Sequence, residues 1–276
     1  MKLLPSLLCV VLLLFSQKSF ANCKDTLNEV LVPGTCTKIQ TFKSDSLTNT
    51  PVLVIALHGD APFNNPSYQY KFASLIAESS KNTVSVGMLR PGYTDHLDRT
   101  SDGIKGKTVG DNYDKPRLDQ IAAAIEKLKQ QYNASKVILA GHSGGSAITA
   151  KIIAVFPQLV NYAFVVSCPC NVNAWRSDMT KRSTYKGFIG NIDVVSPVDL
   201  VEQIDEETVV SVFIGNQDNV TKPYLSEQYV QALKNAGISS DLYKLDGDHK
   251  LFLHKQVIAS VKDVITNYNE AENQKG

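Results

Sequence analysis

The residues best suited to chemistry lie in the stretch GHSGG at positions 141–145, which fits the pattern Gly-x-Ser-x-Gly. An apolar run precedes this stretch and a helical pattern rich in small residues follows it, which is the strand-turn-helix setting of a nucleophile elbow. Such a turn holds a serine in a crowded backbone conformation, and the helix behind it offers free N–H groups to developing negative charge. The stretch therefore predicts Ser143 as a nucleophile, with an incidental serine in a tight turn as the alternative.

A serine nucleophile needs a histidine to take its proton and an acid to orient that histidine. His249 follows the strand predicted at 240–245, where a loop at the carboxyl edge of the sheet would bring it over Ser143. His254, in the helix predicted next, is the alternative base. His142, inside the serine motif, is expected to point away into packing. We therefore predict His249 as the base.

The acid is expected in a loop that leaves the strand predicted at 208–214. Asp218 lies in such a loop, in the stretch GNQD, and we predict that it orients His249. A structural alternative is that Asp218 caps the following helix, because Asp is common at such positions. The other candidate acids are Asp193, Asp246 and Asp248.

The tetrahedral intermediate of acyl transfer carries an oxyanion, which preorganised N–H groups stabilise. One predicted donor is the backbone N–H of Gly144, directly after the nucleophile. The other is the backbone N–H of Asp60, because the loop HGDAP at 58–62 follows a predicted strand and Gly59 lets the backbone turn closely. Asp60 would also bring a carboxylate beside this oxyanion hole.

Four ordered motifs resemble the α/β-hydrolase superfamily: HG at 58–59, GHSGG at 141–145, GNQD at 215–218 and DH at 248–249. The run SPVD at 196–199 is similar to the segment before the acid-bearing strand in prolyl-oligopeptidase-type serine peptidases and related esterases. The resemblance covers most of the chain after its first 51 residues.

The resemblance assigns roles to five residues: Ser143 as nucleophile, Asp218 as acid, His249 as base, and Asp60 and Gly144 as oxyanion donors. It implies a secreted serine hydrolase that cleaves carboxylic esters through an acyl-enzyme, with no cofactor and no metal ion. Two alternatives stay open, a serine peptidase of small peptides and a binding protein that has the fold without activity. The expected partner is a small-molecule ester or a short peptide.

Hydrophobic periodicity predicts strands that alternate with helices. Continuous apolar runs, typical of strands covered on both faces, lie at 52–57, 83–89, 136–140, 162–167, 208–214 and 240–245. Helical patterns lie at 68–80, 117–132, 147–156, 224–236 and 254–268. This succession predicts a mostly parallel, doubly covered sheet, and the resemblance makes it an α/β-hydrolase fold, in a single domain over residues 22–276.

Two long segments do not fit this alternation. Residues 91–114 are polar and glycine-rich and predict a long surface loop, and residues 168–207 predict a short cap-like insertion. Both leave the carboxyl ends of strands, where open α/β sheets place their ligands. Tyr93 and Trp175 are therefore candidate substrate-binding residues, with a simple turn and the core of the cap as their structural alternatives.

The N-terminus has the pattern of a secretory signal peptide. Lys2 precedes an apolar run at 3–15, and the stretch SFA at 19–21 gives a small-x-small cleavage site. We expect residues 1–21 to be removed, export to the periplasm or the medium, and no stable membrane anchor afterwards. An uncleaved anchor is the alternative, although the apolar run is shorter than a bilayer span.

Four cysteines remain after this cleavage, Cys23, Cys36, Cys168 and Cys170, and an oxidising compartment favours disulfides. A bond between Cys23 and Cys36 would close a loop of about 14 residues and stabilise the fold by roughly 3 kcal/mol in the chain-entropy model. Cys168 and Cys170 would then pair with each other or stay reduced. A metal site is disfavoured because no histidine lies near the cysteines at ligand spacing.

The charge balance argues against one class of partner. Lysine and arginine number 28 against 27 aspartate and glutamate, a net charge of +1 over 276 residues. The chain also has no basic run and no interleaving of basic and aromatic residues. It therefore lacks the electrostatic pattern of a nucleic-acid-binding protein.

Overall fold

A computed structural model describes residue 23 and residues 25–190 and 192–274 of the chain. The predicted signal peptide, residues 1–21, lies outside the described residues. Within them, no helix combines the length and the apolarity that crossing a bilayer requires.

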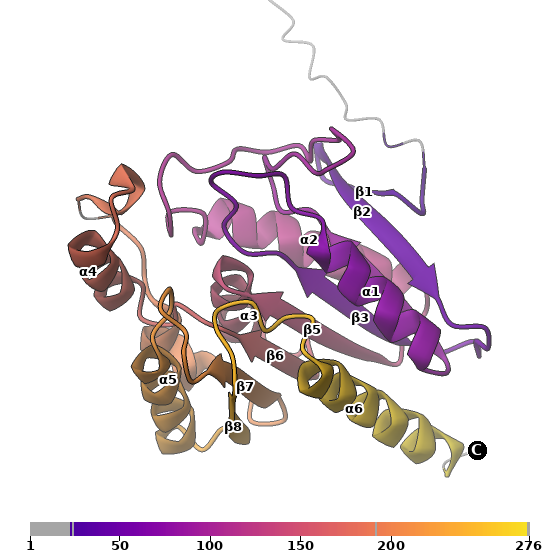
Figure 1. Ribbon diagram of the computed structural model, residues 1–276. Helices are drawn as coiled ribbons and strands as arrows, with labels where there is room; N and C mark the ends of the chain where they lie inside the picture. The colour runs from indigo at the N-terminus through magenta and orange to yellow at the C-terminus, as the bar shows by residue number, and fades with distance from the viewer. Residues whose placement is uncertain (1–22, 24, 191, 275–276) are drawn as a thin grey trace, which may run out of the picture.

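The described residues form one eight-stranded sheet in the order β1-β2-β4-β3-β5-β6-β7-β8 (Figure 1). Its strands are β1 (Glu29–Val32), β2 (Thr35–Lys43), β3 (Val52–Leu57), β4 (Thr83–Met88), β5 (Lys136–His142), β6 (Tyr162–Val166), β7 (Val209–Gly215) and β8 (Ser240–Leu245). The six strands from β3 to β8 pair in parallel. All six lie within one or two residues of the predicted apolar runs, which confirms the predicted mostly parallel sheet.

The first two strands were not predicted, and both are antiparallel. β2 pairs with β4 through a register that runs from Ile39 opposite Met88 to Lys43 opposite Val84, and β1 pairs with β2. Buried and partly exposed side chains mix along β2. It therefore lacks the continuous apolar run that marks the central strands.

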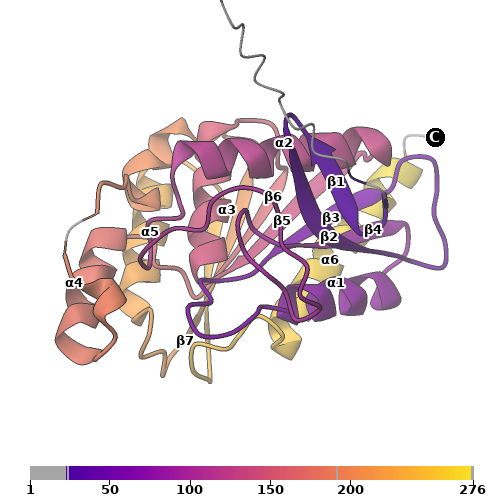
Figure 2. The same ribbon diagram turned by 90° about the horizontal axis from the view of Figure 1, so that it is seen from above.

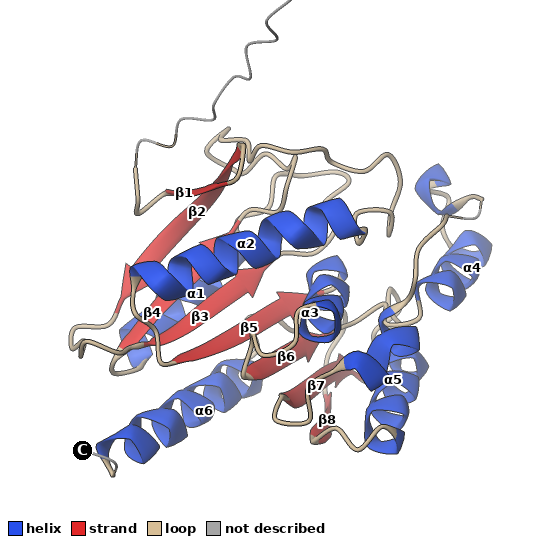
Figure 3. Ribbon diagram, turned by 180° about the vertical axis from the view of Figure 1, so that it is seen from behind, coloured by secondary structure: helices blue, strands red, loops and turns tan. Residues whose placement is uncertain are grey.

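Helices cover both faces of the sheet (Figure 3). One face carries α1 (Tyr68–Ser79) and α6 (Lys255–Asn273), which pack Phe72, Ile76, Val257 and Val261 against the sheet. The other face carries α2 (Lys115–Gln131), α3 (Gly144–Val155) and α5 (Pro223–Asn235), whose apolar side chains form the larger core. The sheet is thus covered on both faces, as an α/β-hydrolase fold requires.

The segment 168–207 contains a helix that the sequence pattern did not reveal, α4 (Val172–Arg182), followed by the short 3-10 helices η1 (Lys186–Phe188) and η2 (Pro197–Gln203). Figure 2 shows α4 set apart from the helices that cover the sheet. The buried Arg176 of α4 donates hydrogen bonds to backbone carbonyls of Val109, Gly187 and Gly190. One guanidinium therefore ties the segment to the loop before α2.

The loop between β4 and α2 is less of a surface loop than its polar composition predicted. Asp95 and Tyr113 are fully buried, and Tyr93 is 2% exposed. Asp95 accepts hydrogen bonds from the Arg99 guanidinium and the Tyr70 hydroxyl. These internal partners allow polar residues to be buried without an unpaired charge.

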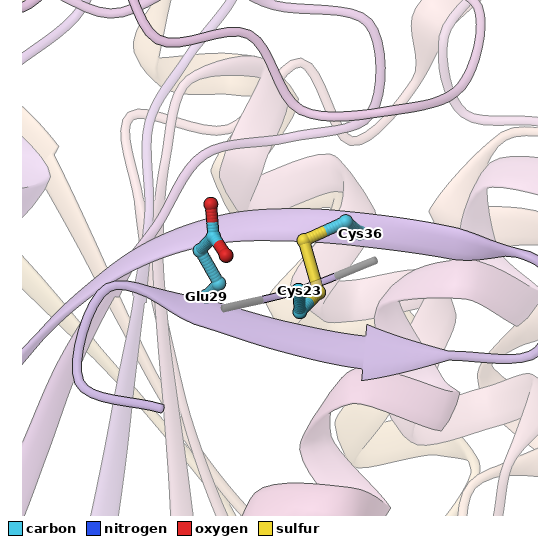
Figure 4. A group of neighbouring side chains, drawn as sticks. All are labelled: Cys23, Glu29 and Cys36. Atoms are coloured by element: carbon cyan, nitrogen blue, oxygen red, sulfur yellow. A yellow bond between two sulfur atoms is a disulfide. The ribbon is translucent and has the colours of Figure 1, made fainter. Parts of the chain in front are cut away.

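The structure contains two disulfides, Cys23–Cys36 and Cys168–Cys170. Figure 4 shows the first of them beside Glu29, a carboxylate close enough to both sulfurs for the three residues to hold a metal ion. The disulfide joins the two sulfurs, so neither is present as the thiolate that a metal requires. Glu29 forms an ion pair with Lys38. Both disulfides therefore act as local cross-links, one near the N-terminus and one directly after β6.

Candidate active site

Ser143 lies in a sharp turn between β5 and α3. Its φ of 53° is unusual for a residue other than glycine. A Cβ on Gly141 would lie 2.3 Å from the Gly145 carbonyl oxygen, and a Cβ on Gly145 would lie 2.5 Å from that of His58. Side chains at these two positions would push the strand and the helix apart, so the glycines are what allow the turn.

Three side chains around this turn form a continuous series of hydrogen bonds. His249 Nε2 lies 3.0 Å from Ser143 Oγ, and His249 Nδ1 lies 2.8 Å from Asp218 Oδ2. The ionised carboxylate can only accept, so Nδ1 carries the proton and Nε2 is free to accept from the serine hydroxyl. Such an arrangement can move the serine proton to Nε2 and stabilise the resulting imidazolium.

Asp218 is held in place by more than His249. Its Oδ1 accepts from the backbone N–H groups of Val220 and Thr221, and its Oδ2 accepts from the Thr221 hydroxyl. Burial raises the pKa of the Asp218 carboxyl, but the bond to His249, its charge and these N–H groups outweigh burial, so the pKa lies below the usual value. The carboxylate thus orders the turn before α5 and also binds the imidazole, but it does not cap α5, whose N-cap is Lys222.

The alternative residues lie elsewhere. His254 is the N-cap of α6 and accepts from the Gln256 N–H. Asp246 binds Asn216 and Gln217 side chains. Asp248 accepts from the Lys250 N–H, and Asp193 is exposed.

The loop after β3 presents a free backbone N–H beside Ser143. Arg90 N–H donates to His58 Nε2 at 3.0 Å, so the His58 proton is on Nδ1, which donates to the Gly59 carbonyl at 2.8 Å. The C=O and N–H of one peptide unit point in opposite directions. The N–H of Asp60 therefore points away from His58. In the described part of the chain, neither this N–H nor that of Gly144 has a hydrogen-bond acceptor.

Both oxygens of the Asp60 carboxylate have hydrogen-bond partners. Arg90 Nη1 lies 3.0 Å from Oδ1, and the Tyr113 hydroxyl donates to Oδ2 at 2.7 Å. The Gly110 N–H adds a bond of 3.2 Å, and the Tyr93 hydroxyl one of 3.4 Å. The buried Arg90 guanidinium therefore balances the negative charge of Asp60 beside the predicted oxyanion hole.

A cavity of about 390 Å³ opens beside Ser143 and His249. Tyr68, His142 and Phe252 give it an aromatic wall, and the exposed Lys250 also contributes to its lining. A larger hollow of about 630 Å³ lies between α2 and the end of α3, away from these side chains. The smaller cavity is thus the one that a reacting group would enter.

Neither Tyr93 nor Trp175 lines this cavity, contrary to expectation. Tyr93 is buried with its ring 4.9 Å from the Arg90 guanidinium. Trp175 is buried in the segment after β6, where its Nε1 donates to the Val220 carbonyl at 2.9 Å and its ring meets Phe188 edge-on. Each side chain has found an internal partner for its polar atom, so packing holds both away from substrate.

His142 packs away from the Ser143 hydroxyl, as expected, and it is also hydrogen-bonded: its Nε2 lies 2.8 Å from the His249 carbonyl oxygen and its Nδ1 2.9 Å from the Tyr68 hydroxyl. Tyr68 was not predicted to lie at this site. Burial, followed by the charge of His249, lowers the pKa of His142 to about 3. Its place at the last residue of β5 was a usable signal, whereas Tyr68 has the pattern of an ordinary first residue of a helix.

The chain is similar to several known proteins. Residues 107–269 match the model of the prolyl oligopeptidase family. Among solved structures, an esterase of Pyrococcus furiosus is 14% identical with a TM-score of 0.63, over 87% of this chain and 89% of that one. A proline iminopeptidase of Mycobacterium smegmatis is 11% identical with a TM-score of 0.64, over 88% and 99%. At such identities the likeness shows the fold alone.

One curated protein, NDRG4-A of Xenopus laevis, is 22% identical over 147 residues. The match covers 53% of this chain but only 34% of that protein. The chain therefore matches about a third of this relative's length.

His58 should make stability fall with acidity. Burial, followed by the charge of Arg90, holds its pKa in the folded protein well below 6.5. As the pH falls below about 6.5, the unfolded chain binds a proton that the folded protein refuses, so the free energy of unfolding should drop by about 1.4 kcal/mol per pH unit. In His58→Asn, the amide can still bond the Gly59 carbonyl. Urea unfolding at pH 6.0 to 4.5 should therefore show a free energy of unfolding that changes with pH by about 1.4 kcal/mol per unit less than in the wild type. The exposed His96→Asn is the control, and an equal change there would contradict the prediction.

The pair of Asp60 and Arg90 should behave as one unit. Asp60→Ala leaves a buried guanidinium without its carboxylate, and the free energy of unfolding should fall by about 3–5 kcal/mol. The double variant Asp60→Ala/Arg90→Met should lose less than the single one, because no unpaired charge remains. Urea unfolding of both variants and of Arg90→Met measures the coupling. The prediction would be wrong if the loss in the double variant equalled the sum of the losses in the two single variants.

Proposed function

Because the chain belongs to the prolyl oligopeptidase family, we propose that it is a serine hydrolase that cleaves carboxylic esters through an acyl-enzyme. The observation that carries the proposal is the hydrogen-bond series from Ser143 through His249 to Asp218, at 3.0 and 2.8 Å. The order of these residues along the chain is that of the α/β-hydrolase triad.

In the proposed reaction, Ser143 Oγ attacks the ester carbonyl while His249 Nε2 takes its proton. Asp218 stabilises the imidazolium, and the N–H groups of Asp60 and Gly144 bind the oxyanion. His249 then returns the proton to the leaving alcohol as the C–O bond breaks, which leaves an acyl group on Ser143. Water, deprotonated by His249, attacks this acyl group; the bond to Ser143 Oγ breaks, His249 returns the proton to Oγ, and the carboxylic acid is released.

The charges around the cavity favour esters over peptides with a free amino terminus. A peptide ammonium needs a carboxylate partner, but Asp60 is occupied by Arg90 and Asp218 by His249. The charged side chain left at the cavity is Lys250, for which the described residues offer no ion-pair partner. An acyl group with an apolar or aromatic body suits the wall of Tyr68, His142 and Phe252.

We also propose that the protein acts after export. Two disulfides support this location, because such bonds persist in oxidising compartments and are rare in the cytosol.

A fluorophosphonate probe tests the nucleophile. The mature protein should be labelled covalently, and Ser143→Ala should abolish the label while the far-UV circular dichroism stays unchanged. Asp218→Asn, which removes the carboxylate that orients His249, should slow hydrolysis of a p-nitrophenyl ester by about 10⁴-fold. Label that persists undiminished in Ser143→Ala, or no label on the wild type, would refute the proposal.

A substrate panel separates ester from peptide hydrolysis. Short-chain p-nitrophenyl esters and aminoacyl amides are compared at equal enzyme concentration, with Ser143→Ala as the blank. We expect rapid ester cleavage and little release from the amides. The reverse pattern would make the protein a peptidase, and no turnover of either by a protein that accepts the probe would place its substrate in another class.

A further inference from the structure

Two histidines lie next to Ser143, but only His249 faces its hydroxyl. His142 precedes the nucleophile directly and is 7% exposed. Its ring lies edge-on to Tyr68, with centroids 5.3 Å apart, and near Phe252 at 5.8 Å. Phe252 in turn stacks on Phe72 at 4.2 Å. The ring of His142 is therefore fixed by packing and cannot turn toward substrate without breaking this aromatic group.

The hydrogen bonds of His142 have a single consistent direction. A carbonyl oxygen only accepts, so Nε2 must donate to the main chain of His249. The neutral ring then has a lone pair on Nδ1, which accepts from the Tyr68 hydroxyl. Because the hydroxyl proton is donated to His142, the oxygen of Tyr68 acts as the acceptor for the Gly59 N–H, at 2.5 Å. Both ring nitrogens of His142 are thus occupied, so it cannot serve as a second base.

This series links three parts of the candidate site that come from distant segments. Gly59 belongs to the loop after β3 that carries the proposed oxyanion donor Asp60, which we call the oxyanion loop. His142 directly precedes Ser143, and His249, the proposed base, lies on the loop after β8. The second donor to the His249 carbonyl is the Ser167 hydroxyl at 3.2 Å. The shorter of the two bonds comes from His142.

On the basis of the proposed function, we infer that His142 and Tyr68 are positioning residues that hold the loop of the base and the oxyanion loop in register around Ser143. The hydrogen bond from His142 fixes the position of the His249 main chain, and therefore the distance from His249 Nε2 to Ser143 Oγ. The Tyr68 hydroxyl bonds both His142 and the Gly59 N–H, so it fixes the position of Gly59 relative to His142. The next peptide unit after Gly59 carries the Asp60 N–H. Neither residue gives or takes a proton in the reaction.

Substitutions at His142 separate this role from simple packing. His142→Phe keeps the ring and loses both bonds, and kcat for a p-nitrophenyl ester should fall on the order of 100-fold, as expected for a reacting group displaced by about 1 Å. The KM should change less than about threefold, because the aromatic wall remains.

Two amides provide matched rescue. The amide nitrogen of His142→Gln reaches the place of Nε2, so it can donate to the His249 carbonyl and should restore kcat to within about tenfold of the wild type. His142→Asn reaches only the level of Nδ1 and should stay close to His142→Phe. Tyr68→Phe leaves the Gly59 N–H without its acceptor but keeps the bond from His142 to His249, so kcat should fall.

Titration of active sites with the fluorophosphonate gives kcat per competent molecule, so misfolded protein does not enter the comparison. The inference is refuted if His142→Phe keeps kcat per labelled site within threefold of the wild type, or if His142→Asn restores kcat as well as His142→Gln does. A wild-type protein that neither accepts the label nor cleaves esters would instead refute the proposed function.

Discussion

The backbones at the ends of β3 and β5 approach so closely that the rest of the site depends on this contact. A Cβ on Gly59 would lie 2.8 Å from the Ser143 Cβ, and one on Gly144 would meet the Asp60 carboxylate at 2.5 Å. Glycine at these places lets the loop after β3 reach the start of α3. This approach brings Asp60 next to Gly144, the two residues predicted as oxyanion donors.

Each of the two buried imidazoles beside this contact, His58 and His142, has one placement of its proton that satisfies both ring nitrogens. His58 carries its proton on Nδ1, whereas His142 carries its own on Nε2, and each choice follows from a neighbour that can only donate or only accept. Burial keeps both rings neutral, as the lowered pKa of each indicates. The directions of the hydrogen bonds therefore fix the loops, and a proton in the wrong place would leave a buried donor facing a donor.

Much of this arrangement could be predicted from the sequence. Continuous apolar runs identified the parallel strands because both faces of those strands are buried, and chain order pointed to Ser143, Asp218 and His249, which the structure joins by hydrogen bonds. The antiparallel strands β1 and β2 were not predicted, because half-exposed strands mix polar with apolar residues.

The remaining errors concern side chains whose partners lie far away in sequence. Tyr93 was placed in the pocket, although its hydroxyl donates to the carboxylate of Asp60, 33 residues away, inside the protein. The function inferred for Tyr68 depends on His142, which lies 74 residues away. Helical periodicity indicates which face of a helix is buried but not which single atom it meets.

Under the proposed function, the positive φ of Ser143 makes this residue the place where the fold exchanges stability for reactivity. A residue with a Cβ in that conformation costs on the order of 1–3 kcal/mol, which the surrounding packing must supply. Glycine would relax the turn and remove the hydroxyl in the same step. The most stable version of this chain and the reactive one are therefore different sequences, so selection for thermal resistance alone would tend to erase the serine.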